Sequence, residues 1–167
     1  MSKILNSFEE WESALDLQPH PEGGAFREVY RAPHDVTCHQ RDVVRCASTG
    51  IYFLLGKNDF SAFHRIESDE MWHFYAGDPL RVVILHEDGS LEAIVLGQDI
   101  LAGQHLQAVV PARCWFAAHV CDGGAYSLVG CTVAPGFEFD DFELACAEQL
   151  VQQFPQHEAE IRALTRQ

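Results

Sequence analysis

The chain has 167 residues, of which 47% are hydrophobic, and it includes 11 Phe, 3 Trp and 4 Tyr. This length predicts a single domain, and so many aromatic residues exclude intrinsic disorder. The 25 acidic and 11 basic side chains give a net charge of −14, which excludes nucleic acids and anionic membranes as partners, because phosphate binding needs clustered Lys and Arg.

A short helix is predicted near the start of the chain. Ser7-Phe-Glu-Glu10 has the S-x-x-E pattern of a capping box, and apolar residues follow it at helical spacing. These signals indicate a helix over about residues 7–16. The segment 17–24 contains two prolines and two glycines, which end the helix.

A strand is predicted from Ala25, where the hydrophobic period changes to two. The alternation places Phe26, Glu28 and Tyr30 on one face of this strand and the residues between them on the other. The polar segment 32–40 then predicts a loop.

From Gly50 to Val133 the sequence predicts about eight short strands, spaced about 8–12 residues apart as in sandwiches and barrels. No helical pattern separates them, which argues against a parallel βαβ sheet. After Gly136 the pattern becomes helical again over about residues 141–165, with Pro155 as an interruption. The predicted fold class is therefore all-β, with short helices at both ends of the chain.

Six cysteines are scattered along the chain without a CxxC pair or a zinc-type spacing. We expect free thiols in a reducing compartment, and no signal-peptide pattern precedes residue 12. No apolar run approaches the roughly 20 residues that a membrane helix needs. These observations predict a cytoplasmic protein with no membrane partner.

The segment 63–77 carries the side chains best suited to chemistry. A hairpin that turns around residues 67–69 would bring His64 and Glu70 close together. An imidazole beside a carboxylate can act as a general base, and the same two side chains can instead bind a metal. A structural pair that only satisfies its own hydrogen bonds is the third interpretation.

Alternation along the second strand of this hairpin separates its side chains into two sets. Glu70, Trp72 and Phe74 share one face, whereas His73 and Tyr75 point to the other. The aromatic side chains either line a ligand cavity or fill the interior of a small barrel.

At this point the chain resembles the cupin superfamily, whose first motif is G-x5-H-x-H-x(3,4)-E-x6-G. His64, Glu70 and Gly77 match the motif at the expected spacings. Ile66 stands where the motif has its second His, and Phe116 stands where the second cupin motif has its metal-binding His. Two of the four usual metal ligands are thus replaced by apolar residues.

Within that superfamily the chain resembles the cupin-5 family (DUF985), whose function is uncharacterised. The resemblance covers about residues 15–145, in the segments 17–31, 48–55, 68–75 and 135–143. It implies a double-stranded β-helix, or jelly-roll barrel, over about residues 25–135 in a single cupin domain of residues 1–167. It also implies a homodimer and a shape related to nucleotide-sugar epimerases of the RmlC type.

The first functional hypothesis is a metal-independent isomerase or epimerase acting on a small polar or sugar-derived substrate. In this hypothesis His64 abstracts a proton next to a carbonyl, Glu70 orients the imidazole, and Tyr30 or Tyr75 donates a proton from the other side. This mechanism needs no cofactor.

The expected ligand contacts come from two groups of residues. Arg27 and Glu28 either form a charged rim at the site or are solvated or paired across a dimer interface. The other candidate ligand-binding residues are Trp72, His73, Phe74 and Phe116.

Two alternatives remain open from the sequence. One is a small-molecule-binding protein that has no catalytic activity, which the replacement of a ligand His by Phe116 favours. The other is a divergent metal-binding cupin that uses His64, Glu70 and His73 as ligands of a divalent ion.

Overall fold

The computed structural model describes residues 4–166, which form thirteen strands, three α-helices and three 3-10 helices. The strands are β1 (Gln18–Pro19), β2 (Ala25–Arg31), β3 (Asp35–Cys38), β4 (Val43–Cys46), β5 (Thr49–Gly56), β6 (Phe60–Ile66), β7 (Asp69–Gly77), β8 (Leu80–Leu85), β9 (Leu91–Leu96), β10 (Gln107–Val110), β11 (Trp115–Val120), β12 (Tyr126–Ala134) and β13 (Phe142–Leu144). The helices are α1 (Phe8–Leu15), η1 (Ile100–Ala102), η2 (Phe139–Asp141), α2 (Ala147–Gln153), η3 (Pro155–His157) and α3 (Glu158–Ala163).

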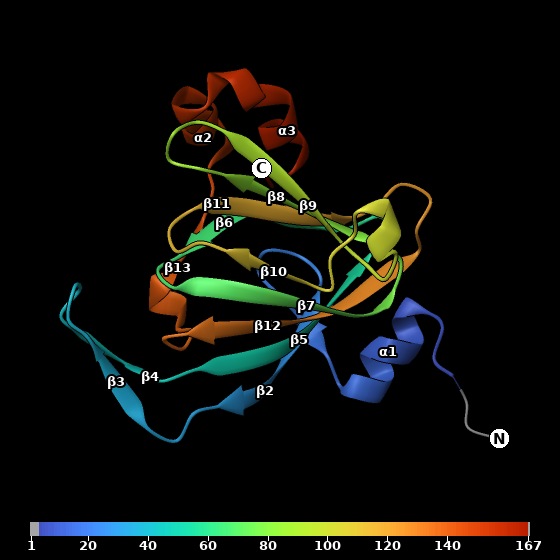
Figure 1. Ribbon diagram of the computed structural model, residues 1–167, viewed down its shortest axis with the longest axis horizontal. Helices are drawn as coiled ribbons and strands as arrows, with labels where there is room; N and C mark the ends of the chain where they lie inside the picture. Colours follow the sequence, from blue (N-terminus) through green and yellow to red (C-terminus); the bar gives the residue numbers. More distant parts are fainter. Residues whose placement is uncertain (1–3, 167) are drawn as a thin grey trace.

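Two antiparallel sheets pack face to face in an all-β jelly roll (Figure 1). The first sheet has the order β1-β2-β5-β12-β7-β10 and the second has the order β13-β6-β11-β8-β9. The hairpin β3-β4 projects from one side of this pair, and α2 and α3 lie together at one end of the view. The predicted fold class is therefore confirmed.

Local sequence signals explain most of these elements. Ser7 caps α1, because its hydroxyl accepts a hydrogen bond of 3.2 Å from the backbone N–H of Glu10. The eight strands predicted between Gly50 and Val133 are all present as β5 to β12. Pro155 lies two residues beyond the end of α2, as expected for a residue that cannot continue a helix.

Two predicted elements were wrong. Segment 32–40 was expected to be a loop but contains β3, whose partly or fully exposed side chains give no hydrophobic period to detect. Residues 142–144 were expected to be helical but form β13, which pairs with β6 through Phe142 and Ile66. Pairing with an exposed sheet edge satisfies backbone groups and here overrides local helix propensity.

The main core lies between the two sheets. Phe53 and Trp72 from the first sheet meet Phe116 from the second, with ring centroids 5.8 and 6.2 Å from Trp72. Each of these rings is at most 1% exposed, and burying one stabilises the fold by about 1.5–3 kcal/mol. A second cluster buries α2 and α3 against the outer face of the second sheet.

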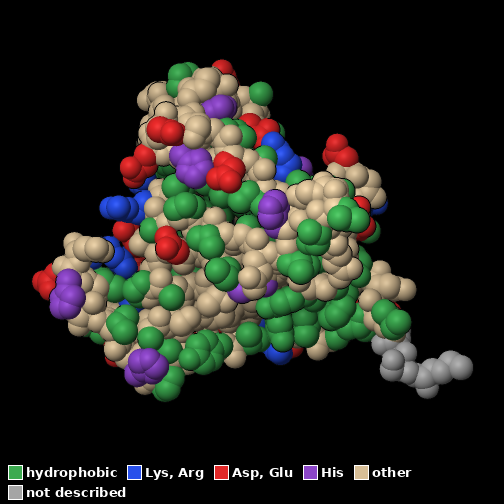
Figure 2. All heavy atoms as spheres, viewed as in Figure 1, with side chains coloured by type: hydrophobic (Ala, Val, Ile, Leu, Met, Phe, Trp, Pro, Cys, Tyr) green, Lys and Arg blue, Asp and Glu red, His purple; other side chains and the backbone are tan. Residues whose placement is uncertain are grey.

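The outer face of the first sheet is covered only in part. α1 packs on it at Leu54 and Leu128, and apolar side chains elsewhere on this face stay exposed. Val29, Met71, Tyr75 and Val109 are each between 37% and 47% exposed on strands β2, β7 and β10. Figure 2 shows hydrophobic side chains spread over the lower half of the same view, where Figure 1 places most of this sheet. The homodimer expected from the sequence stays a prediction.

The structure also bears on the expected free thiols and on the expected absence of a membrane helix. All six cysteines are free. Within residues 4–166 no helix is both long enough and apolar enough to cross a membrane.

A bulge in β2 changes which of its side chains face inward. The pairing of β2 with β5 shifts register between Glu28 and Tyr30, so that Tyr30 lies opposite Gly50 and Arg31 lies opposite Thr49. The predicted strict alternation therefore holds up to Glu28 and fails beyond it. Tyr30 is turned outward and is 51% exposed, and Arg31 takes its place on the inner side.

Candidate functional site

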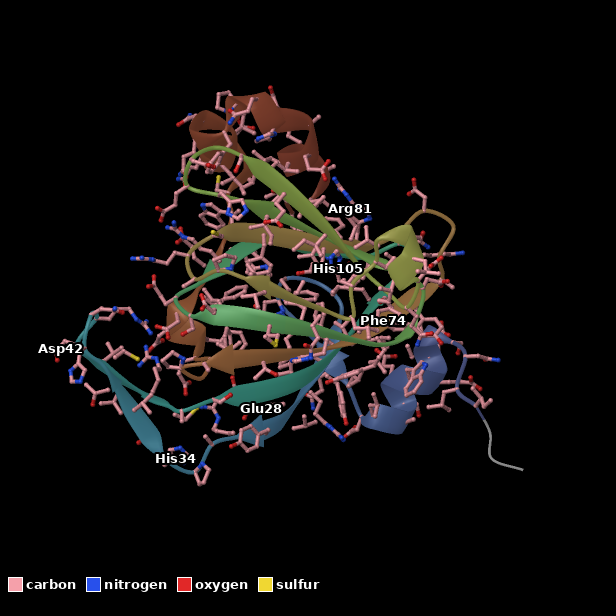
Figure 3. All side chains as sticks on the ribbon, viewed as in Figure 1. Glu28, His34, Asp42, Phe74, Arg81 and His105 are labelled. Carbon is pink, nitrogen blue, oxygen red and sulfur yellow. The ribbon has the colours of Figure 1, made fainter. Side chains whose placement is uncertain are left out.

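A cavity of about 100 Å³ lies between the sheets, where β2, β5, β6, β7 and β12 meet two chain segments, 20–24 and 136–142. Its wall includes four glutamates and two histidines, and the three most deeply buried of these side chains are Glu22, His64 and Glu70. Figure 3 labels Glu28, another lining residue, on β2, on the same side of the view as the β3-β4 hairpin. Phe74, labelled at the far end of β7, belongs to the core instead.

A glycine turn carries Glu22 into this wall. Gly23 has φ +115° and Gly24 has φ +72°, which are left-handed conformations that favour glycine. A Cβ on Gly23 would lie 2.1 Å from the carbonyl oxygen of Phe60. The turn then lets the carbonyl of Glu22 accept a hydrogen bond of 2.8 Å from the N–H of Ala62 on β6.

Glu22 and His64 form a buried ion pair. His64 Nε2 lies 3.0 Å from Glu22 Oε2, and the two side chains are 2% and 8% exposed. Burial alone would lower the pKa of His64, but the Glu22 carboxylate outweighs it and raises that pKa above 6.5. Burial alone would raise the pKa of Glu22, but His64 and Ser61 lower it below 4.5.

Both ring nitrogens of His64 are already bonded. Nδ1 donates to the carbonyl oxygen of Ala62 at 2.7 Å, and Nε2 donates to Glu22. The other oxygen of Glu22 accepts a hydrogen bond of 2.9 Å from the Ser61 hydroxyl. These bonds hold the imidazolium in one orientation, with no nitrogen lone pair left for a substrate or a metal.

A second imidazole, that of His20, lines the same cavity. Its Nδ1 accepts a hydrogen bond of 3.3 Å from the backbone N–H of Glu22. Burial lowers the pKa of His20, and the charge of His64 lowers it further, whereas Glu22 opposes the change. The ring is therefore neutral at pH 7, and its remaining hydrogen lies on Nε2.

Glu70 is the second buried carboxyl of the site. Its side chain points inward from β7, and the residue is 8% exposed. Burial raises the pKa of Glu70 to about 7, and the nearby Glu22 carboxylate also raises it. The charge of His64 and a hydrogen bond from the Cys131 thiol act in the opposite direction but do not cancel the effect of burial. Glu70 thus exchanges its proton near neutral pH, as a general acid or base does.

Charged and aromatic side chains surround the mouth of the cavity. Arg31 donates two hydrogen bonds of 2.9 Å to Glu28 and one of 2.5 Å to Glu138. The segment 136–142 brings three Phe rings over the opening, and the N–H of Phe137 donates a 2.9 Å hydrogen bond to the Thr49 hydroxyl. Asp141, bound by Arg41 and Arg45, anchors the far end of this segment.

The structure brings His64 and Glu70 to the same cavity, as the hairpin in the sequence predicted. They attract one another electrostatically, but the hydrogen-bonded partner of His64 is Glu22. Sequence reasoning missed Glu22 in this role, although the paired glycines after it were a signal of an inward turn.

Other candidate residues from the sequence lie outside the cavity wall. His73 and Tyr75 lie on the outer face of β7, as the alternation predicted, and Arg27 is exposed on β2. Nδ1 of His73 lies 3.1 Å from the side-chain nitrogen of Gln107, and Nε2 lies 3.0 Å from the hydroxyl of Thr132. Trp72, Phe74 and Phe116 belong to the core between the sheets.

Comparison with known protein families shows which family this chain belongs to. Residues 9–145 match the family described as Cupin superfamily (DUF985). The chain belongs to this cupin family. An uncharacterised protein of Saccharomyces cerevisiae is 26% identical over 153 residues, which cover 84% of this chain and 74% of the yeast protein.

Solved structures of similar cupins have nearly the same fold. A hypothetical protein from Leishmania major is 37% identical, with a TM-score of 0.93 over 97% of this chain and 100% of its own. A protein from Shewanella oneidensis is 39% identical, with a TM-score of 0.89 over 98% of this chain and 99% of its own. Oxalate decarboxylase from Bacillus subtilis, at 16% identity and a TM-score of 0.55, covers 98% of this chain with 40% of its own length and shares only the fold.

The metal centre typical of cupins does not fit these residues. Ile66 and Phe116 occupy two of the ligand positions, and the Phe116 ring lies 4.1 Å from the His64 ring, centroid to centroid. The nitrogens of His64 are already bonded to Glu22 and Ala62. His73, the third ligand of the alternative set, is on the opposite face of β7, and residues 4–166 contain no cluster of three metal-ligating side chains.

Proposed function

We propose that this cupin is a metal-independent isomerase that binds a small hydroxycarbonyl compound and moves a proton between two of its carbon atoms. Glu70 carries the proposal, because it is a buried carboxyl beside a cavity and its pKa is about 7. A base with this pKa is half ionised near neutral pH, which suits proton transfer from carbon.

The size of the cavity limits the enclosed part of the substrate. Its volume of about 100 Å³ is smaller than the cavity of about 150 Å³ that holds benzene. The space thus encloses about four non-hydrogen atoms, and the rest of a larger substrate extends through the mouth. A two- or three-carbon hydroxycarbonyl unit fits this limit.

The proposed reaction needs only two side chains in contact with the substrate. The Glu70 carboxylate takes a proton from the carbon that bears the hydroxyl, and the electron pair of the C–H bond forms the C=C bond of an enediolate. His20 Nε2–H gives its proton to the carbonyl oxygen and recovers one from the hydroxyl oxygen. Glu70 then returns its proton to the neighbouring carbon, so the step balances without a cofactor.

His64 takes a different role from the base expected from the sequence. Its two N–H groups are bonded to Glu22 and Ala62, so it is a fixed positive charge near the reacting carboxyl. This charge favours the ionised form of Glu70, while burial and Glu22 oppose it. His64 is therefore a positioning residue that sets the proton affinity of Glu70.

Hydrogen–deuterium exchange tests the proposal. A panel of two- to six-carbon hydroxyaldehydes and hydroxyketones, with and without amino groups, is incubated with protein in D₂O, and the C–H signals are followed by NMR. We expect the wild type to catalyse exchange with at least one compound, and Glu70→Gln to slow it by about 100-fold or more. The rate should rise with pH through about 7, as Glu70 ionises.

Glu67→Gln is the matched control, because Glu67 is exposed in the turn between β6 and β7, outside the residues that line the cavity. Its exchange rate should equal that of the wild type. If no compound exchanges faster with wild type than with Glu70→Gln, the enzyme proposal is wrong. A compound that binds without exchange would then support the alternative, a binding protein without catalytic activity.

A further inference from the structure

The charges that line the cavity are unbalanced. Four glutamates, Glu22, Glu28, Glu70 and Glu138, face one arginine and two histidines. The imidazolium of His64 is neutralised by Glu22. Arg31, the remaining cation, is opposed by two carboxylates, so the site carries a net negative charge.

Arg31 has no capacity left for an anionic ligand. Its Nε and one terminal nitrogen are bonded to Glu28, and its other terminal nitrogen is bonded to Glu138. The same guanidinium also donates to the carbonyl oxygen of Phe137. A carboxylate or phosphate ligand would have to displace one of these glutamates and would be repelled by the other.

Aromatic rings gather at the mouth of this negative site. The His20 ring stacks on Phe139 at 6.0 Å and meets Phe26 edge-on at 4.5 Å, measured between ring centroids. Phe137 and Phe142 lie 5.0 and 6.1 Å from Phe139. Phe139 is 53% exposed, so a large apolar ring faces the solvent at the opening. Faces of aromatic rings attract cations, and several such rings together are a known way to bind ammonium groups.

His20 supplies an independent sign that a ligand belongs here. Its side chain is only 6% exposed, and its Nδ1 accepts from the N–H of Glu22. Its Nε2 has no hydrogen-bonded partner among residues 4–166, although the ring lines the cavity. A ligand whose carbonyl oxygen enters the cavity can accept a hydrogen bond from this N–H.

We propose that the cavity selects a small hydroxycarbonyl compound that also carries an ammonium group, whose carbonyl oxygen accepts from His20 and whose ammonium group lies against Phe139 and Glu138. This proposal names a substrate class for the isomerase reaction proposed above, and in that respect it rests on that reaction. The selectivity itself rests on the charges and the rings, so it can be measured by binding alone.

Three compounds with the same carbonyl skeleton test the selectivity. Aminoacetone carries an ammonium group, hydroxyacetone is neutral, and pyruvate carries a carboxylate. We expect isothermal titration calorimetry with the full chain at neutral pH to show aminoacetone binding about tenfold or more tightly than hydroxyacetone, and pyruvate most weakly. Equal affinities, a preference for pyruvate, or no binding of any of the three at millimolar concentration would overturn the proposal.

Two variants locate the ammonium group. Phe139→Leu should weaken aminoacetone binding by about two- to thirtyfold and leave hydroxyacetone binding nearly unchanged. Glu138→Gln should also weaken aminoacetone binding, and it should strengthen pyruvate binding because Arg31 loses one of its two carboxylates. Unchanged preferences in both variants would overturn the proposal even if the wild type prefers the cation.

The matched control is Glu148→Gln, because Glu148 is also paired with an arginine, Arg162, but lies on α2 outside the cavity wall. Its affinities should equal those of the wild type. The isomerase proposal and the cation-site proposal can be contradicted by different results. Selective aminoacetone binding without proton exchange contradicts only the isomerase, whereas proton exchange with a preference for pyruvate contradicts only the cation site.

Discussion

Replacing Glu70 by Gln is expected to stabilise the protein at high pH. Burial raises the pKa of Glu70 from 4.5 to about 7, so the unfolded chain releases this proton at lower pH than the folded one. Because the folded pKa is raised, stability falls as pH rises from about 4.5 to about 7 and stays lower above that range. At about 1.4 kcal/mol per pKa unit, the full cost is about 3 kcal/mol. Gln has nearly the same shape and cannot ionise, so it avoids this cost.

Urea denaturation followed by tryptophan fluorescence measures the effect. The free energy of unfolding of Glu70→Gln should exceed that of the wild type by about 3 kcal/mol near pH 9 and by less than about 1 kcal/mol near pH 5. Glu67→Gln, at an exposed position, should show no such dependence on pH. A difference that does not change with pH, or a variant that is less stable than the wild type at pH 9, would refute the argument. A gain in stability with a loss of proton exchange would mark Glu70 as a residue kept for function.

Two further predictions concern the turn that carries Glu22. Glu22→Gln should lower the pKa of His64, measured by NMR titration of the ring, because the carboxylate that raises it is gone; a pKa that stays above 6.5 would contradict the ion pair. Gly23→Ala should destabilise the protein by about 1–3 kcal/mol in urea denaturation, since it strains a left-handed backbone and places a methyl group against the Phe60 carbonyl. An alanine variant as stable as the wild type would show that the turn tolerates a side chain.

Elements with a strong local signal were predictable, and elements that depend on a distant partner were not. Ser7 and its capping hydrogen bond mark the start of α1 in the sequence alone. The strand β13 is different, because it exists through pairing with β6, some 80 residues earlier, and its own residues carry no strand pattern. The bulge in β2 is a similar case. Only the pairing with β5 shows that Arg31, and not Tyr30, faces the cavity.

The candidate site was predictable only in part for the same reason. The spacing of His64 and Glu70 around a tight turn was enough to predict that they share a cavity, since hairpin geometry is local. The partner of His64 comes from a turn about 40 residues away, and no periodicity connects the two segments. The segment 136–142, which supplies Phe139 and Glu138, lies mostly before the helix predicted from about residue 141, and no local pattern connects it with the cavity.

The sequence by itself determined an acidic, aromatic-rich all-β fold with a His and a Glu on adjacent strands, because alternation and turn residues act over a few positions. The tertiary structure decided which charges meet. It pairs His64 with Glu22 and buries Glu70, whose pKa is therefore about 7. It also enclosed Arg31 between two carboxylates. Burial and distance set those proton affinities, and both are properties of packed segments from different parts of the chain.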